Sequence, residues 1–352
     1  MAPSHTMAGG ESGDSYSQHS TYQRALLEAT KEKIDEAITT KLDLYFTSNS
    51  FSFNVADFGC STGPNTFVAV QNIIDAVGHK FQEQTLENPK DVEFQVFFND
   101  HSNNDFNTLF RTLPPTRSYF ATAVPGSFFG RVLPKDCLHV GHCSYSLHWL
   151  SRVPRGITAR DSPAWNKDIH CTGFTKEVAD AYLDQFKVDF GGFLSARAQE
   201  FVSGGLLMLL GSCLPDGVKM SETMKGILFD CIGSSLNDVA KQGLIDQEKL
   251  DSFNMPIYVA QVGEIKDVIE ENGCFELEAF EKVSHANDEF PLDAKFLATL
   301  HKVTFGGLFE SQFGKDAVEK AMGCFEGKVQ DSLQELANAK AGMQFFVLLR
   351  RK

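Results

Sequence analysis

Short apolar segments alternate with longer stretches of helical hydrophobic spacing, and this alternation restricts the fold more than any other feature of the chain. Segments with the apolar character of buried strands lie at residues 53–58, 92–98, 119–124, 138–144, 206–212 and, at the end, 343–350. Between them, apolar residues recur at the spacing of one helix face, as in 22–44, 67–77 and 175–202. Strands that alternate with helices predict an α/β fold, a doubly wound Rossmann-like sheet with crossover connections.

One segment departs from this alternation. Residues 220–336 are mainly helical in pattern and precede the last predicted strand. We therefore expect a core made of residues 21–219 and 337–352, with residues 220–336 as a helical cap that contributes to the substrate pocket. Residues 1–20 are rich in Gly, Ser, His and Gln, which predicts a flexible lid segment that closes over the site.

The charge balance and the cysteine pattern narrow the class of protein. The chain has 46 acidic and 32 basic residues, a formal net charge of −14, whereas proteins that bind nucleic acid carry dense basic stripes. We expect neither a nucleic-acid partner nor a membrane, because no apolar run approaches the roughly 20 residues that span a bilayer and the polar start lacks a secretory signal. The eight scattered cysteines favour free thiols in a soluble, cytoplasmic protein.

The segment CLHVGHC brings four side chains of the zinc-ligand type within seven residues: Cys137, His139, His142 and Cys143. Structural zinc sites normally draw pairs of ligands from two separate turns. Here the sequence alternates like a strand, which directs neighbouring side chains to opposite faces. We therefore interpret these residues as half-buried members of a strand.

A loop of small residues follows the first predicted strand, in the stretch VADFGCSTGPNT (55–66). Gly59 and Gly63 are four positions apart, which does not fit the dinucleotide fingerprint G-x-G-x-x-G, and the loop has no lysine of the phosphate-binding type. Asp57 at the end of the strand suits an ammonium group better than a phosphate. Glycines permit close backbone approach, and ligands of open α/β sheets bind outside the carboxyl ends of the strands.

The next predicted strand, FQVFFND, ends in a second acidic residue, Asp100. An acid in this place commonly holds ribose hydroxyls. A ligand that carries an amino group and a ribose, but no pyrophosphate, is S-adenosylmethionine. The two acids and the glycine loop favour this cofactor, and an NAD-linked oxidoreductase with an unusual loop is the alternative from another class.

Six ordered segments give the chain a specific resemblance. They are SYSQHSTYQ (15–23), ADFGCSTGPNT (56–66), FFNDHSNNDFNTLF (97–110), VPGSFFGRVLP (124–134), SYSLHWLSRVP (144–154) and LDSFNMPIY (250–258). In these motifs, over essentially its whole length, the chain resembles the plant SABATH family of S-adenosylmethionine-dependent methyltransferases. The resemblance implies a class I methyltransferase sheet and an enzyme that forms methyl esters of small carboxylic acids or methylates xanthine nitrogens. The wording is most similar to the farnesoate- and jasmonate-type carboxyl methyltransferases.

The resemblance also implies roles for individual residues. The family's cofactor contacts are matched by Ser20, Asp57, Gly59, Cys60, Asn65, Asp100, Ser127, Phe128, Ser144 and Tyr145. The substrate pocket is matched by Tyr16, Gln23, Tyr145, His148, Trp149, Leu228, Phe229, Tyr258 and His301. A magnesium site of some members is matched by Asn166, Asp251, the backbone carbonyl of Phe253, and Asn254, and such oxygen ligands suit a hard cation.

Gln23 and Trp149 match the pair that holds the substrate carboxylate, and we expect them to be the catalytic residues. A carboxylic acid is already ionised at neutral pH, so the nucleophile needs no general base. An amide N–H and an indole N–H orient it without adding charge, whereas a lysine would lower its nucleophilicity and repel the sulfonium. The expected reaction is methyl transfer to the carboxylate of a small plant acid: a hormone, a terpenoid or an aromatic acid.

Two further functions stay open at this point. The first is N-methylation of a xanthine-like substrate, which needs polar groups matched to a purine edge, and only His148 and His301 are candidates for these. The second is a catalytically silent binding protein, against which the intact Gln23 and Trp149 pair argues. A homodimer is also left open.

Overall fold

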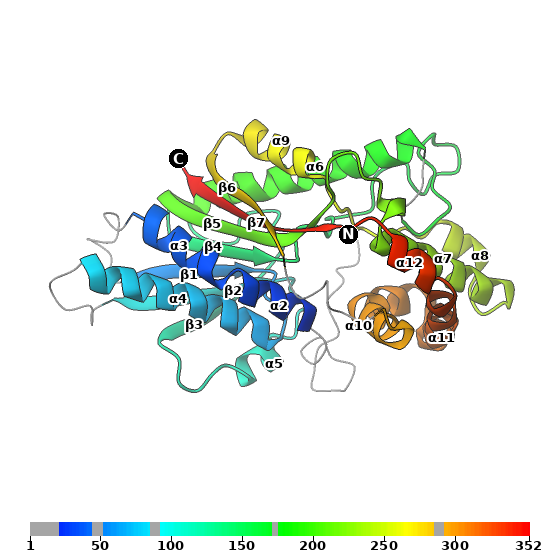
Figure 1. Ribbon diagram of the computed structural model, residues 1–352, viewed down its shortest axis with the longest axis horizontal. Helices are drawn as coiled ribbons and strands as arrows, with labels where there is room; N and C mark the ends of the chain where they lie inside the picture. The colour runs from blue at the N-terminus through cyan, green and yellow to red at the C-terminus, as the bar shows by residue number, and fades with distance from the viewer. Residues whose placement is uncertain (1–20, 44–51, 85–91, 171–174, 285–291) are drawn as a thin grey trace.

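The strands form one mixed sheet in the computed structural model, which describes residues 21–43, 52–84, 92–170, 175–284 and 292–352. The strands are β1 (Ser52–Phe58), β2 (Glu93–Asp100), β3 (Tyr119–Pro125), β4 (Leu138–Ser144), β5 (Phe201–Cys213), β6 (Phe275–Val283) and β7 (Met343–Arg351). Their order in the sheet is β3-β2-β1-β4-β5-β7-β6 (Figure 1). Strands β1 to β5 run parallel, and β7 is antiparallel to both of its neighbours. The predicted lid, residues 1–20, lies outside the described residues, and so do Tyr16 and Ser20.

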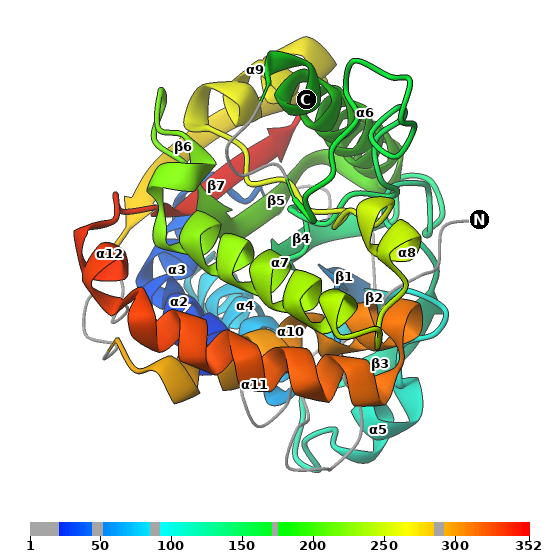
Figure 2. The same cartoon turned by 90° about the vertical axis from the view of Figure 1, so that its right-hand side faces the viewer.

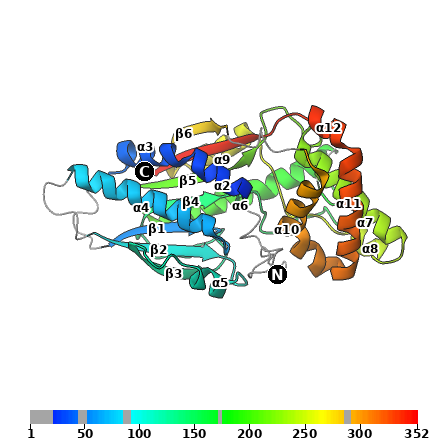
Figure 3. The same cartoon turned by 60° about the horizontal axis from the view of Figure 1, so that its bottom comes forward.

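Helices cover both faces of the sheet, as expected for a doubly wound fold. One face carries α2 (Thr21–Ala29), α3 (Lys31–Lys41) and α4 (Pro64–Gln84), and Figure 3 shows α4 running along the sheet. The other face carries α6 (Lys176–Glu200) and α9 (Val262–Asn272). The short α5 (Phe106–Arg111) follows β2. The predicted α/β class is therefore confirmed.

The helix expected over 22–44 is divided in two, and Thr30 separates α2 from α3. The hydroxyl of Thr30 donates to the carbonyl oxygens of Leu26, at 2.8 Å, and Leu27, at 3.2 Å. Such back-bonding from a Thr side chain competes with the regular helix pattern and bends helices. The apolar periodicity continues across the bend, which is why the sequence predicts one helix.

A second group of helices gathers at one end of the sheet, at the right in Figure 1 and in front of the strands in Figure 2. It consists of α7 (Met224–Lys241), α8 (Gln247–Asp251), α10 (Ala294–Phe313), α11 (Lys315–Asp331) and α12 (Leu333–Asn338), and the 3₁₀ helix η3 (Met220–Glu222) precedes it. These helices pack around an apolar core of their own, separate from the two cores on the sheet faces. We call this group the cap.

The cap differs from the expected segment 220–336 in one respect. Residues 262–283 leave the cap and return to the sheet as α9 and β6, and β6 pairs with β7 at the edge. The sequence of β6, FELEAFEKV, contains three glutamates and a lysine, and much of the strand is exposed. An edge strand with polar side chains lacks the apolar run that identifies the buried strands.

No helix in the described ranges is both long enough and apolar enough to cross a membrane.

Candidate active site

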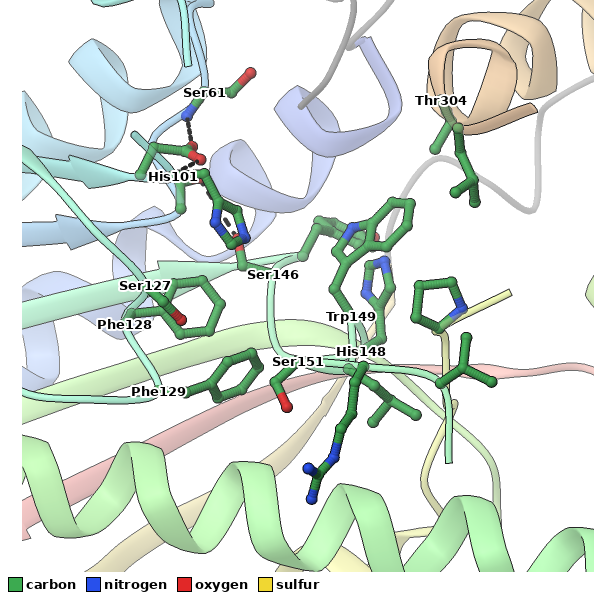
Figure 4. A pocket seen from close by; sticks show the side chains of 18 of the residues that line it. Ser61, His101, Ser127, Phe128, Phe129, Ser146, His148, Trp149, Ser151 and Thr304 are labelled. Carbon is green, nitrogen blue, oxygen red and sulfur yellow. Dashed lines mark hydrogen bonds between the residues drawn. The ribbon is translucent and has the colours of Figure 1, made fainter. Parts of the chain in front are cut away.

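A cleft of about 520 Å³ opens between the carboxyl edge of the sheet and the cap, a size usual for small-molecule sites. Its walls come from the loops after β1, β2, β3 and β4, from residues 252–256, and from α10 (Figure 4). A second cavity of about 30 Å³ adjoins it and shares Gln23, Gly59, Ser61 and Ser144 as lining residues. We call the two the main cleft and the small cavity.

The glycine loop follows β1 in a conformation that only glycine accepts at its first position. Gly59 has φ +80°, and a Cβ atom there would lie 2.1 Å from Oγ of Ser146. The backbone N–H groups of Gly59 and Cys60 donate to the carbonyl oxygen of Asn99, at 2.8 and 3.0 Å. Helix α4 then begins at Pro64, a residue well suited to the first helical position. The loop is thus held against the end of β2 and leaves space in front of it.

Asp100 ends β2 and lines the main cleft. Its two carboxylate oxygens accept the backbone N–H groups of Ser61 and His101, each at 2.7 Å. Burial raises the pKa of the Asp100 carboxyl, and these two N–H groups oppose the rise. A carboxylate has about four lone-pair sites, so Asp100 can still accept hydroxyl groups from a ligand.

Asp57 lies behind the glycine loop and is almost fully buried. One carboxylate oxygen is 2.7 Å from Nδ1 of His142, and the other accepts the hydroxyl of Thr66. Asp57 lines the small cavity with both oxygens already engaged. The neighbouring Cys60 is a thiol, because burial, followed by the charges of Asp100 and Asp57, raises its pKa well above the usual value.

The small cavity is lined by polar atoms that are buried without a hydrogen-bond partner. Four such atoms in the described part of the chain face it: Oε1 of Gln23, Oγ of Ser61, Nε2 of His142 and Oγ of Ser144. Buried polar groups in proteins are nearly always paired. Their gathering at one cavity indicates a polar ligand group, and the donors and acceptors fit the amino-acid end of S-adenosylmethionine.

The loop after β3 supplies Ser127, Phe128 and Phe129 to the main cleft (Figure 4). It is supported from beneath by Arg197 of α6, a fully buried residue. The guanidinium donates to the carbonyl oxygens of Phe128, at 2.7 Å, and Gly130, at 3.0 Å. Its charge is matched by Glu200, whose carboxylate lies 2.7 Å from Nε. Helical spacing alone does not predict this buried pair, because Arg and Glu in a long helix usually face solvent.

The loop after β4 carries Ser144, Tyr145 and Trp149 to the junction of sheet and cap. Tyr145 has φ +52°, a strained conformation that is common at functional sites. Its hydroxyl donates to Oε1 of Gln344, at 2.6 Å. Trp149 packs against Phe305 of α10, with ring centroids 5.9 Å apart. Trp149 therefore lines the cleft from the sheet side, and its ring packs against the cap.

Gln23, at the start of α2, lines both the main cleft and the small cavity. The structure thus brings Gln23, Trp149 and His148 to one cleft. Burial, with a smaller contribution from the positive charge of Lys225, lowers the pKa of His148 to about 3, so this imidazole is neutral at physiological pH.

Four predicted pocket residues do not line the main cleft: Leu228, Phe229, Tyr258 and His301. Phe305 stands between Trp149 and two of them, since its ring lies 5.6 Å from Phe229 and 5.7 Å from His301. Tyr258 donates its hydroxyl to Glu264 at 3.0 Å. Their substrate role remains a prediction. Conversely, Thr304, Leu308 and Gln312 of α10 line the cleft, and nothing in the helical periodicity singled them out.

Three of the predicted magnesium ligands, Asn166, Asp251 and Asn254, have hydrogen-bond partners within the protein, and the magnesium role of the set remains a prediction. The side-chain N–H of Asn166 donates to Oδ1 of Asn254 at 2.8 Å. The carboxylate of Asp251 accepts from Gln247 within α8. The described residues contain no cluster of three or more His, Cys, Asp or Glu side chains placed to hold a metal ion. Phe253 and Asn254 instead line the main cleft.

Residues 138–143 of CLHVGHC lie on β4, as the strand interpretation predicts, and Cys137 directly precedes the strand. The strand residues are buried rather than half-buried, because β4 lies inside the sheet. The two imidazoles have different partners. Nδ1 of His139 accepts the backbone N–H of Asn54 at 2.9 Å, and its ring stacks on Phe53, whereas His142 pairs with Asp57. All cysteines in the described ranges are free thiols.

Sheet and site together define an α/β enzyme that binds its ligand at the carboxyl edge of a doubly wound sheet, between that edge and a helical cap. Residues 2–352 match a family described as SAM dependent carboxyl methyltransferase, and the chain belongs to this family. The resemblance to SABATH methyltransferases is confirmed, and the assignment sets aside the NAD-linked oxidoreductase.

Relatives match the chain over its whole length. Farnesoic acid carboxyl-O-methyltransferase of Arabidopsis thaliana is 60% identical, and the match covers 100% of both chains. Paraxanthine methyltransferase 2 of the same plant is 54% identical and covers 98% of each. A solved structure of loganic acid methyltransferase with SAH superimposes with a TM-score of 0.93 at 42% identity, covering 98% of both chains.

Proposed function

We propose that this protein transfers a methyl group from S-adenosylmethionine to the carboxylate of a small plant acid and releases its methyl ester. The observation that carries the proposal is the pairing of two spaces. A small cavity of unpartnered polar atoms, suited to the amino-acid end of the cofactor, opens into a larger cleft where Trp149 and Gln23 meet.

The residues of the cleft suit a reaction that needs positioning rather than acid–base catalysis. The bound cofactor supplies a methyl group on a sulfonium. A carboxylate is ionised at neutral pH, so the chain has only to orient it and exclude water, and alignment of this kind can supply about 7–11 kcal/mol. Gln23 and Trp149 donate N–H groups without charge. The low pKa of His148, about 3, keeps it from adding a cation beside the sulfonium.

The apolar part of the cleft suits the hydrocarbon body of the substrate. Phe129, Val153, Pro256 and Leu308 line it. Together with the 60% identity to a farnesoic acid methyltransferase, this lining supports a terpenoid or other chain-like acid rather than a compact aromatic one. The polar contribution of the cap to the lining comes from Thr304 and Gln312 of α10.

N-methylation of a xanthine is the second candidate, and the 54% identity to a paraxanthine methyltransferase favours it. A purine requires hydrogen-bonding groups along its edge, and the imidazoles of His101 and His148 line the main cleft. Burial lowers the pKa of His148 to about 3, so that ring is neutral. A xanthine N–H must also lose a proton, which a carboxylate does not.

A panel of substrates separates these functions. Purified protein is incubated with labelled S-adenosylmethionine and, separately, with farnesoate, jasmonate, benzoate, salicylate, indole acetate, gibberellate, nicotinate and xanthines. Transfer to one or more acids is expected, with chain-like acids preferred. Transfer to xanthines alone would replace the ester function with the second candidate, and no transfer with intact cofactor binding would indicate a silent binding protein.

The remaining parts of the proposal concern location, assembly and metal. Free cysteines and the lack of a candidate membrane helix in the described ranges support a cytoplasmic location.

Phe120 on the edge strand β3 is 60% exposed, which supports a homodimer, to be tested by light scattering. The proposed reaction uses no nucleic acid. The magnesium site that the resemblance implies at Asn166, Asp251, Phe253 and Asn254 stays a prediction; with magnesium bound there, away from the transferred methyl group, EDTA should reduce activity or stability only in part.

A further inference from the structure

His142 is a buried histidine whose second nitrogen faces the small cavity. It lies on β4 directly beside Asp57 on β1, as a register partner in the parallel ladder, and is 1% exposed. Its Nδ1 is 2.7 Å from the carboxylate of Asp57. Its Nε2 has no partner and lies among the residues that line the small cavity. The sequence presents His142 only as part of a strand.

The pairing with Asp57 fixes the tautomer of this imidazole. A carboxylate can only accept hydrogen bonds, and the other oxygen of Asp57 already accepts the hydroxyl of Thr66. Nδ1 of His142 therefore carries a proton, and in the neutral ring Nε2 presents a lone pair to the cavity. Each oxygen of Asp57 already holds one hydrogen bond within the protein, and its charge also acts on the cavity through His142.

Three acceptors converge on the small cavity: Nε2 of His142, Oε1 of Gln23 and Oγ of Ser144. An ammonium group has three N–H donors and matches this set. Among the described residues no lysine or arginine lines the cavity, while Asp57 supplies a negative charge behind the imidazole. A carboxylate in the same place would find the hydroxyls of Ser61 and Ser144 as donors, but it would face the lone pairs of His142 Nε2 and Gln23 Oε1 and no cation among the described lining residues.

We propose that His142, oriented by Asp57, is a positioning residue that accepts a hydrogen bond from the ammonium group of the methyl donor. This inference rests on the proposed function, since it presumes an S-adenosyl ligand. The same inference gives the Gln23 amide two roles. Its oxygen faces the cofactor, and its N–H group is left to bind the substrate carboxylate. One side chain thereby connects the two spaces of the site.

Calorimetry without turnover tests this role. His142→Phe keeps the ring shape and removes the acceptor, and its affinity is measured for S-adenosylhomocysteine, for the desamino analogue of that compound, and for decarboxylated S-adenosylmethionine, which retains the ammonium. We expect the variant to lose about tenfold or more in affinity for both ligands that carry the ammonium, the scale of one hydrogen bond to a charged group. The desamino analogue should bind the variant and the wild type equally.

Two further variants keep the test decisive. Asp57→Asn is nearly isosteric; its amide oxygen can accept from Thr66, and its NH₂ then faces Nδ1 of His142, which moves the imidazole proton to Nε2. The same selective loss for ammonium ligands is expected, even if His142→Phe does not fold. His139→Phe is the matched control, because this histidine of the same strand contacts Asn54 and lies outside the small cavity; it should leave all three affinities unchanged.

The possible results distinguish a failure of the His142 role from a failure of the proposed function. If the wild type binds none of the S-adenosyl ligands, the proposed function fails. If the wild type binds them and His142→Phe and Asp57→Asn bind them equally well, only the role of His142 is overturned. A loss for the desamino analogue, with none for the decarboxylated ligand, would also overturn it by assigning His142 to the carboxylate.

Discussion

At the scale of single residues, the most specific prediction about catalysis concerns Trp149. Its indole N–H is a neutral donor in the cleft, and its ring is held by Phe305. Trp149→Phe keeps most of the ring and removes the N–H. We expect kcat/KM for the best acid to fall at least tenfold, about 1.4 kcal/mol in the barrier, while the affinity for S-adenosylhomocysteine stays unchanged.

Gln23 provides the contrast to Trp149. Because Oε1 of Gln23 faces the small cavity, Gln23→Leu should weaken both cofactor binding and transfer, whereas the tryptophan variant affects transfer alone. Steady-state kinetics and calorimetry on the same preparations distinguish the two patterns. A double variant that esterifies the best acid at the wild-type rate would rule out both residues as carboxylate holders.

The sequence predicted those site residues that stand next to a recognisable turn or strand end. Asp57 and Asp100 end two predicted strands, and the glycine loop lies between them, so their place at the carboxyl edge followed from the strand pattern. The roles of His142 and Arg197 did not follow. Each role depends on a partner that strand register or helix packing brings close. The local spacing of apolar residues predicts neither the register nor the packing.

At the scale of secondary-structure elements, the buried pair of Arg197 and Glu200 links α6 to the loop after β3. Arg197 holds the Phe128 and Gly130 carbonyl oxygens, and Glu200 accepts the backbone N–H groups of Val132 and Leu133 at 2.6 and 2.9 Å. Arg197→Leu leaves the Glu200 charge buried and unpaired. We expect a loss of about 3–5 kcal/mol in the free energy of unfolding and weaker binding of S-adenosylhomocysteine, measured by denaturant titration and calorimetry.

Lys176, at the exposed start of the same helix, is the matched control for Arg197. It pairs with Asp180 in solvent, so Lys176→Leu should change neither stability nor ligand affinity measurably. Equal stability of the Arg197 and Lys176 variants would show that the buried pair does not support the loop.

The first turn of α7 contains a lysine in an unfavourable place. Burial lowers the pKa of Lys225 to about 8 from 10.5, and its side-chain nitrogen donates to Ser212 at 2.9 Å. No carboxylate in the described residues pairs with it. A positive charge at a helix N-terminus also opposes the helix dipole. Lys225 is therefore a charged group that the folded state tolerates at a cost.

The pH dependence of this cost has a definite sign. Below pH 8 the ammonium is charged in both states, and the full cost is present; between pH 8 and 10.5 the folded state releases the proton first, so the cost disappears. Lys225→Met should stabilise the protein by about 1–3 kcal/mol at pH 7, with a difference that shrinks toward pH 10.5. Denaturant titrations at both pH values check this, and a difference independent of pH would contradict it.

The elements that the sequence predicted well are the buried ones. The strands at 53–58 and 138–144 are short segments in which apolar residues recur between turn signals, and they lie in the middle of the sheet. The edge strand β6 was missed, because a solvated strand at the edge has no such pattern. As a result, the expected cap included residues 262–283, which form helix α9 on one face of the sheet and its edge strand β6. The boundary of the expected cap was therefore misplaced at β6, whose sequence resembles that of an exposed helix.

At the scale of the whole molecule, the site depends on two separately packed bodies. The cap has its own apolar core, and the two faces of the sheet have theirs. The main cleft takes Gly59 and Asp100 from the sheet side and Thr304 and Leu308 from the cap. A ligand that fills the cleft contacts both, so binding of S-adenosylhomocysteine with an acid should stabilise the folded protein by mass action.

Acid should unfold this molecule through its neutral buried histidines. Burial lowers the pKa values of His139, His170 and His301 to about 4 and that of His148 to about 3. In the unfolded chain these groups titrate near 6.5, so the unfolded state binds more protons between pH 6.5 and 4. Stability is full above pH 6.5 and falls as the pH drops. The buried carboxyls of Asp100 and Asp189 have raised pKa values and act in the opposite direction.

Because four lowered pKa values oppose two raised ones, the net effect of acid is a loss of stability. We expect about 1–2 kcal/mol per histidine between pH 7 and pH 5, a large fraction of the usual 5–15 kcal/mol of a folded protein. Denaturant titrations at the two pH values measure the loss. His139→Phe removes one of the four groups. The difference in bound protons between the unfolded and folded states should therefore fall by up to one, and the free energy of unfolding should depend less steeply on pH. Equal stability at pH 5 and pH 7 would contradict the expectation, since it would mean that these imidazoles bind protons equally in both states.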